Sequence, residues 1–70
     1  MKPTDALQAS LHRPVYVETR DGHAYRGRLE AFDQHLNLVL ASAEEVAPDG
    51  SAAPAGLALL RGDAVVFVAP

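Results

Sequence analysis

The sequence contains no cysteine and little positive charge, and both shortages limit what the chain can be. Without cysteine, neither disulfides nor cysteine-ligated zinc can support a domain of only 70 residues, which buries a small core. Six Lys and Arg against nine Asp and Glu give a formal net charge of -3, which argues against a general polyanion binder. We therefore expect oligomerisation to supplement the core, and any nucleic-acid contact to be local and directed at bases.

Long apolar segments are also missing. The first ten residues have no apolar signal core, and no apolar run approaches the roughly 20 residues of a membrane-spanning helix. The sequence therefore predicts a cytoplasmic protein without membrane contact. No internal repeat or second domain is visible, so residues 1–70 are interpreted as one domain.

The N-terminal part predicts a short helix and a β-hairpin. Thr4 can cap a helix over residues 4–12. Residues 15–19 then alternate apolar and polar side chains, as a half-buried strand does. Asp21 and Gly22 follow as a strong tight-turn signal, so the next residues should form the return strand of a hairpin.

The return strand is expected over residues 23–32, with Leu29 and Ala31 on one face. It contains Gly27, and a glycine inside a strand often marks a sharp bend. A third strand should follow over residues 37–43. The sequence thus predicts a strongly bent antiparallel sheet.

The C-terminal part predicts a variable loop and two last strands. Residues 44–56 are rich in Pro, Gly and Ala and are interpreted as the loop, with strands at 57–60 and 64–69. Residues 65–68 are apolar without alternation, which predicts a strand that is covered on both faces or paired along its outer edge. The fourth strand of a neighbouring copy could pair there, and such a head-to-tail contact can close into a ring.

Two short polar clusters stand among these apolar residues and could meet as neighbouring loops. The first is Asp33, Gln34, His35, Leu36 and Asn37, and the second is Leu60, Arg61, Gly62 and Asp63. A base that lies flat needs a planar or cationic surface on each face and a polar edge that matches its hydrogen-bonding groups. His35 and Arg61 could supply the two faces. The Asn37 amide, both donor and acceptor, suits the edge of uracil.

The spacing of the two clusters resembles the two-part signature of the Sm and Sm-like (Lsm) RNA-binding proteins. The matching residues are Gly27, Phe32, Asp33, His35 and Asn37 in the first motif and Arg61, Gly62, Asp63, Val65 and Val66 in the second. Leu36 stands where Met is usual, and Leu60 where Ile is usual. The resemblance covers about residues 11–70, and it is to archaeal and eukaryotic members more than to the bacterial RNA chaperone of the superfamily.

The resemblance implies a mostly β fold, in which a short N-terminal helix precedes a strongly bent five-stranded antiparallel sheet. This small barrel would assemble into a homo-oligomeric ring, for which a heptamer is favoured. In the family, the matching residues clamp one uridine per subunit at the inner rim. By that resemblance, Asp33 orients the amide of Asn37 or the guanidinium of Arg61, and Gly62 lets the backbone approach the base. We expect binding of uridine-rich single-stranded RNA, as a chaperone or scaffold, without a cofactor.

Each site residue also has a plainer interpretation. Alone, His35 would be an exposed loop histidine, Asn37 a turn residue and Arg61 a surface charge. Asp63 is interpreted mainly as the cap of its turn. Together the residues favour the RNA site, and the alternative is a small-barrel assembly module with a vestigial pocket.

Metal binding and catalysis are less favoured. His12, His23 and His35 are irregularly separated and lack matched acidic or cysteine ligands, so we expect no metal site. Asp33 beside His35 could suggest the general base of a ring nuclease, but no activated nucleophile is recognisable. We therefore expect no enzymatic activity. Arg13, near the end of the helix, is a candidate for a second RNA contact.

Overall fold

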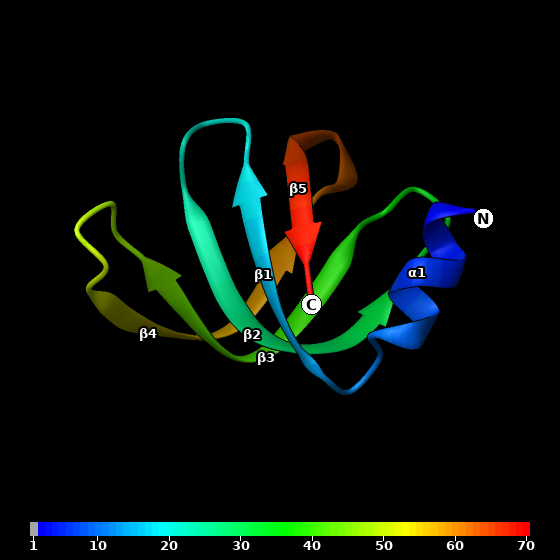
Figure 1. Cartoon of the computed structure of the whole chain (residues 1–70), viewed down its shortest axis with the longest axis horizontal. Coiled ribbons are helices and arrows are strands. Elements are labelled where there is room, and N and C mark those ends of the chain that lie inside the picture. The colour runs from blue at the N-terminus through cyan, green and yellow to red at the C-terminus, as the bar shows by residue number, and fades with distance from the viewer. Residues whose placement is uncertain (1) are drawn as a thin grey trace.

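One short helix and one bent sheet account for the chain, of which the computed structural model describes residues 2–70 (Figure 1). The elements are helix α1 (Pro3–Ala9), strands β1 (Pro14–Thr19), β2 (Ala24–Phe32), β3 (Leu38–Val46) and β4 (Ala52–Leu60), the 3-10 helix η1 (Gly62–Ala64) and strand β5 (Val65–Ala69). All strand pairs are antiparallel, in the order β4-β3-β2-β1-β5. The predicted short helix and five-stranded antiparallel sheet are confirmed.

Helix α1 begins and ends earlier than the predicted 4–12. Its N-cap is Lys2, whose backbone N–H donates to the carboxylate of Asp5 at 3.2 Å. After the helix, His12 takes a positive φ of 66° and donates its N–H to the carbonyl of Leu29 at 2.6 Å. The segment after α1 is therefore tied to β2 and cannot extend the helix.

Strands β2 and β3 bend together over the core, as Gly27 predicted. A Cβ at Gly27 would lie 3.1 Å from the carbonyl oxygen of Ala41, a tight contact, so glycine at this position favours the close approach of the two backbones. The pairing register of β2 with β3 shifts twice, and one shift lies between Leu29 and Ala31. The prediction that these two residues share a face is wrong, because the irregularity leaves Leu29 buried and Ala31 exposed.

The predicted loop over residues 44–56 is wrong in extent. Val46 pairs with Ala52, so strands β3 and β4 continue well into this segment and only the five residues between them form the turn. The third and fourth strands are therefore longer than the predicted 37–43 and 57–60. Pro54 lies in β4, which is an edge strand, where proline is tolerated because one side of the strand needs no ladder donor. In Figure 1 this β3–β4 hairpin extends to the left, away from α1.

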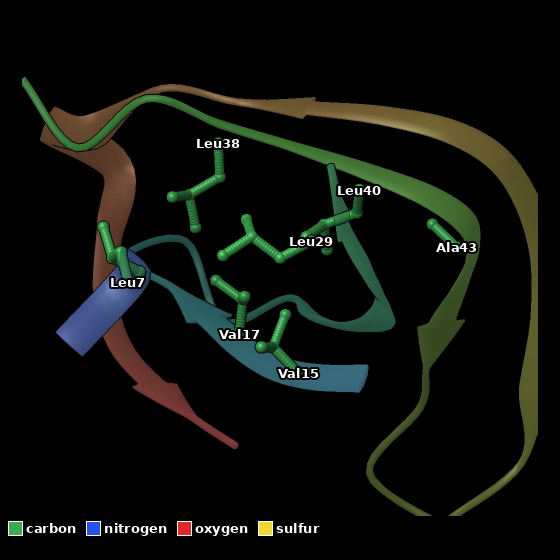
Figure 2. Packing of buried hydrophobic residues seen from close by; sticks show 7 residues of the cluster. All are labelled: Leu7, Val15, Val17, Leu29, Leu38, Leu40 and Ala43. Carbon is green, nitrogen blue, oxygen red and sulfur yellow. The ribbon is translucent and has the colours of Figure 1, made fainter. Parts of the chain in front are cut away.

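The core lies on the inner side of the bent sheet, with α1 closing one end (Figure 2). Its buried members are Leu7, Val15, Val17, Leu29, Leu38, Leu40 and Ala43. Burying one such Leu or Val side chain contributes about 1.5–3 kcal/mol, so this small set supports only a modest domain stability. Among residues 2–70, no helix is long and apolar enough to cross a membrane.

The two edge strands expose large apolar side chains. Leu57 and Leu59 of β4 are 66% and 71% exposed, and Val66 and Phe67 of β5 are 61% and 50% exposed. The outer edges of β4 and β5 pair with no other strand in the part of the chain that the structure describes. Within a single chain, Val65 and Val68 of the last strand pack against the core, whereas Val66 and Phe67 are left uncovered.

Candidate nucleic-acid interface

Asp33 organises the turn between β2 and β3. Its Oδ1 accepts the backbone N–H of His35 at 2.9 Å and that of Asn37 at 3.1 Å, while its Oδ2 accepts the Nδ2–H of Asn37 at 2.9 Å. The bond from the Asn37 amide is the main cause that lowers the pKa of Asp33, and the two backbone N–H groups add to it. The turn is therefore built around a charged carboxylate at neutral pH.

The side-chain amide of Asn37 joins the two motifs. Its Oδ1 accepts the backbone N–H of Gly62 at 2.7 Å, across a sequence separation of 25 residues. Because the Asp33 carboxylate can only accept and the Gly62 N–H can only donate, these two partners fix which end of the amide is oxygen and which is nitrogen. One N–H and one lone pair of the amide remain for a ligand.

The second motif fits against the first only because residue 62 is glycine. A Cβ at Gly62 would lie 1.8 Å from the carbonyl oxygen of His35, which is an impossible contact. The two motifs reach each other because Leu38 pairs with Leu60 at the end of the β3–β4 ladder. The prediction that the two clusters meet as neighbouring segments is confirmed. Their role in RNA binding stays a prediction.

Arg61 and His35 are open to solvent on these adjacent segments. The Arg61 guanidinium donates to the carboxylate of Asp63 at 3.1 Å, and its side chain is 81% exposed. Of the two roles considered for Asp33, it therefore orients Asn37 and not Arg61. The interpretation of Asp63 as the turn cap stays a prediction, and the turn itself is closed by the N–H of Ala64, which donates to the carbonyl of Arg61 at 3.0 Å.

Sequence reasoning missed Arg20, which lies in the β1–β2 turn and contacts the second motif. Its backbone N–H donates to the carbonyl of Ala64 at 2.7 Å, and its Nε–H donates to the carbonyl of Asp63 at 3.2 Å. No sequence signal marks this role, because an arginine before an Asp-Gly turn has the pattern of an ordinary surface charge.

The histidines do not gather. His12 lies 3.4 Å from a carboxylate oxygen of Glu30, and His23 lies 2.8 Å from one of Glu45, on different parts of the sheet. Between Lys2 and Pro70, no group of three or more His, Cys, Asp or Glu side chains is placed to hold a metal ion.

Comparison with known proteins identifies the family. The chain matches the LSM domain family over residues 5–70. It belongs to the Sm-like family. An snRNP Sm-like protein of Archaeoglobus fulgidus is 44% identical over 69 residues, which are 99% of this chain and 90% of that protein. Membership of this family confirms the prediction that the chain is not an enzyme.

Solved structures give the same result for the fold. The structure of a heptameric archaeal Sm protein is 44% identical, with a TM-score of 0.89 over 94% of this chain and 96% of the other. An Sm protein of Pyrococcus abyssi, solved in complex with a uridine heptamer, is 39% identical, with a TM-score of 0.91 over 100% of this chain and 99% of the other. The predicted Sm-like small barrel is therefore confirmed.

Proposed function

We propose that this Sm-like chain binds uridine-rich single-stranded RNA at a site built from its two motifs. The observation that carries the proposal is the Asn37 amide, held between the Asp33 carboxylate at 2.9 Å and the Gly62 N–H at 2.7 Å. The remaining donor and acceptor of this amide form a polar edge of known orientation. The P. abyssi protein, which is similar over its whole length, was solved with a uridine heptamer, and this supports the choice of ligand.

The fixed amide gives a physical reason for choosing uracil over cytosine. Uracil presents an N–H donor beside a carbonyl acceptor at its edge, and cytosine presents an acceptor beside an amine donor. A free asparagine could serve either base by turning its amide over. Asn37 cannot do so without placing its N–H groups against the Gly62 N–H and its oxygen against the Asp33 carboxylate. Asn37 is exposed in the free chain, but a bound base would cover its amide, and a mismatched pair there would cost about 1–3 kcal/mol, which is roughly tenfold or more in affinity.

His35 and Arg61 are proposed as the two faces that hold the base. Both side chains are exposed and extend from segments that touch through Gly62 and the His35 carbonyl. Because Asp63 already pairs with Arg61, the guanidinium contributes more by stacking than by adding net positive charge. This agrees with a chain of net charge -3. Stacking contributes roughly 1–3 kcal/mol per base.

We further propose a closed homo-oligomeric ring, with seven copies favoured. The support is the pair of open edges on β4 and β5, together with their exposed apolar side chains Leu59 and Val66. The archaeal relative with a TM-score of 0.89 is a heptamer, as is SmAP1 of P. aerophilum, with a TM-score of 0.92. In such a ring the uridine site repeats around the pore, which suits an RNA chaperone or scaffold. We propose the cytoplasm as its compartment.

The experiment that tests the site compares oligouridine, oligocytidine and oligoadenosine at one salt concentration. We expect oligouridine to bind most tightly, and Asn37→Ala to remove most of the preference. Variant His35→Ala should bind oligouridine more weakly, with little change in the salt dependence of the affinity, because it removes stacking and no phosphate contact. Equal affinity of the parent chain for all three RNAs, or full binding by Asn37→Ala and Arg61→Ala, would instead favour an assembly module with a vestigial pocket.

The experiment that tests the ring is native mass spectrometry of the parent chain and of Val66→Lys. A charge on β5 should be costly where β5 meets a neighbouring strand, so Val66→Lys should lower assembly. Pro14→Lys, at an exposed residue at the start of β1, is the matched control and should leave assembly unchanged. A folded monomer of the parent chain at micromolar concentration would exclude the ring.

A further inference from the structure

The segment that carries Arg61 is held from two sides. On one side, Gly62 fits against the His35 carbonyl and donates to Asn37 at 2.7 Å. On the other side, Arg20 donates its backbone N–H to the carbonyl of Ala64 and its Nε–H to the carbonyl of Asp63. The first contact belongs to the uridine site described above. The second comes from the β1–β2 turn, which is not part of either motif.

The side chain of Arg20 acts on the residue that controls Arg61. Its Nε–H fixes the carbonyl of Asp63 at 3.2 Å, and the carboxylate of the same Asp63 holds the Arg61 guanidinium at 3.1 Å. With its side chain 81% exposed, Arg61 has few other restraints on its position. The Nε–H of Arg20 is a side-chain donor to the carbonyl of Asp63, so loss of the Arg20 side chain removes this restraint on the segment.

We propose that Arg20 is a positioning residue for the uridine site: through Asp63 it holds Arg61 in the place where Arg61 stacks on the base. This inference rests on the proposed function. Arg20 forms no ion pair with a carboxylate in the described chain, so a second possible role would be a direct phosphate contact. The two roles differ in which atom of Arg20 matters. Positioning needs only a donor at Nε, whereas a phosphate contact needs the positive charge.

Two substitutions separate these roles. In Arg20→Gln, the side-chain Nε2 stands the same number of bonds from the backbone as the arginine Nε, so the donor is kept and the charge is lost. In Arg20→Met, both are lost. The ligand is uridine, an uncharged nucleoside, followed by nuclear magnetic resonance titration of the assembled protein. We expect Arg20→Met to bind uridine about three- to tenfold more weakly than the parent, and Arg20→Gln to stay within twofold of it. Arg26→Gln, on β2 and paired with Glu44, is the matched control and should not change binding.

A double-mutant cycle with Arg61→Ala tests whether Arg20 acts through Arg61. We expect Arg20→Met to cause no further loss once Arg61 is removed, because the residue that it positions is gone. Additive losses would overturn the proposal, as would a uridine affinity of Arg20→Met equal to that of the parent. A loss seen in both Arg20 variants, and only with oligouridine, would assign Arg20 to a phosphate instead.

A measurement without ligand separates failure of this inference from failure of the proposed function. Amide hydrogen exchange at Gly62 should be faster in Arg20→Met than in the parent and in Arg20→Gln, because the whole segment is less restrained. If the parent binds no uridine, both proposals fall, whatever the exchange rates. In another outcome, the parent binds uridine and Asn37→Ala does not, while the Gly62 exchange rate and the uridine affinity are the same in Arg20→Met as in the parent. In that case only the positioning role is wrong.

Discussion

The two ends of the β3–β4 hairpin are each organised by an aspartate, but the hydrogen bonds of the two aspartates connect segments at very different sequence separations. At one end, Asp49 accepts the backbone N–H of Ser51 at 2.9 Å and its hydroxyl at 2.6 Å, and both partners are only two residues away. At the other end, Asp33 accepts two backbone N–H groups and the amide of Asn37, which in turn binds Gly62, 25 residues farther along the chain.

This difference separates a turn from a site. The Asp49 network closes its own loop and reaches nothing else, so its loss should be local. The Asp33 network joins segments that are distant in sequence and leaves an oriented donor and acceptor open to solvent. A carboxylate in a turn is therefore informative about function only when its partners include a side chain that reaches another segment.

The largest contrast is expected between Gly62→Ala and Gly50→Ala. The first places a Cβ 1.8 Å from the His35 carbonyl, so the motifs must separate, which should cost about 3 kcal/mol of stability and abolish measurable uridine binding. The second meets no atom within 4 Å but has a φ of +90°, which should cost about 1–2 kcal/mol and leave binding unchanged. Thermal unfolding and uridine titration measure both. Equal effects of the two variants on binding would contradict the comparison.

Replacing each carboxylate should give the next largest difference. Asp33→Asn keeps one acceptor oxygen for the backbone N–H groups and places an NH2 donor where Oδ2 accepts the Asn37 amide, so the preference for oligouridine over oligocytidine should fall about tenfold. Asp49→Asn should leave that preference intact, because its bonds remain within its own turn. Paired titrations with the two RNAs measure the ratio. A ratio that survives Asp33→Asn would show that another group selects the base.

Titration with acid should also distinguish the two ends of the hairpin. Hydrogen bonds lower the pKa of both Asp33 and Asp49 below the ordinary 3.8, with the Asn37 and Ser51 side chains respectively as the main causes. A lowered folded pKa means that each carboxylate stabilises the fold above its ordinary pKa, and that this is lost as pH falls through the folded value.

The amide signals of the free protein report these two titrations. The Gly62 signal should titrate with a midpoint below 3.8 and lose that transition in Asp33→Asn, although the two residues are far apart in sequence. The Ser51 signal should report Asp49 only. A Gly62 signal that is indifferent to Asp33 would break the proposed link between the motifs.

The smallest effect concerns His23, at the same end of the sheet as Asp49. The bond to Glu45 is the main cause that raises the pKa of His23 above 6.5, and Asp21 adds to it. A raised folded pKa stabilises the fold below pH 6.5, and the contribution is lost as pH rises through the folded value. Glu45→Gln should lower this pKa, measured from the ring proton signals, without changing uridine affinity. Any change in affinity would mean that the two ends are coupled.

The same comparison explains what could be predicted from the sequence. The succession of strands along the chain follows from apolar alternation, and the bend follows from a glycine inside a strand. The meeting of the two motifs follows from their spacing. All three signals can be read directly from the sequence. The long β3–β4 hairpin does not, because Pro54 and Gly56 have the pattern of a loop until their place on an edge strand is known. Arg20 was missed for a similar reason, since its partners are backbone carbonyls more than 40 residues away.

The most direct test of the central claim is a structure of the assembled protein with a short oligouridine bound. We expect one uracil per subunit, with its faces on His35 and Arg61 and its N–H and carbonyl edge on the Asn37 amide. The Asp33 and Gly62 bonds to that amide should be unchanged from those seen here. Uracil bound elsewhere, or an Asn37 amide turned away from its Gly62 and Asp33 partners to meet the base, would contradict the claim that the two motifs form a preoriented uridine site.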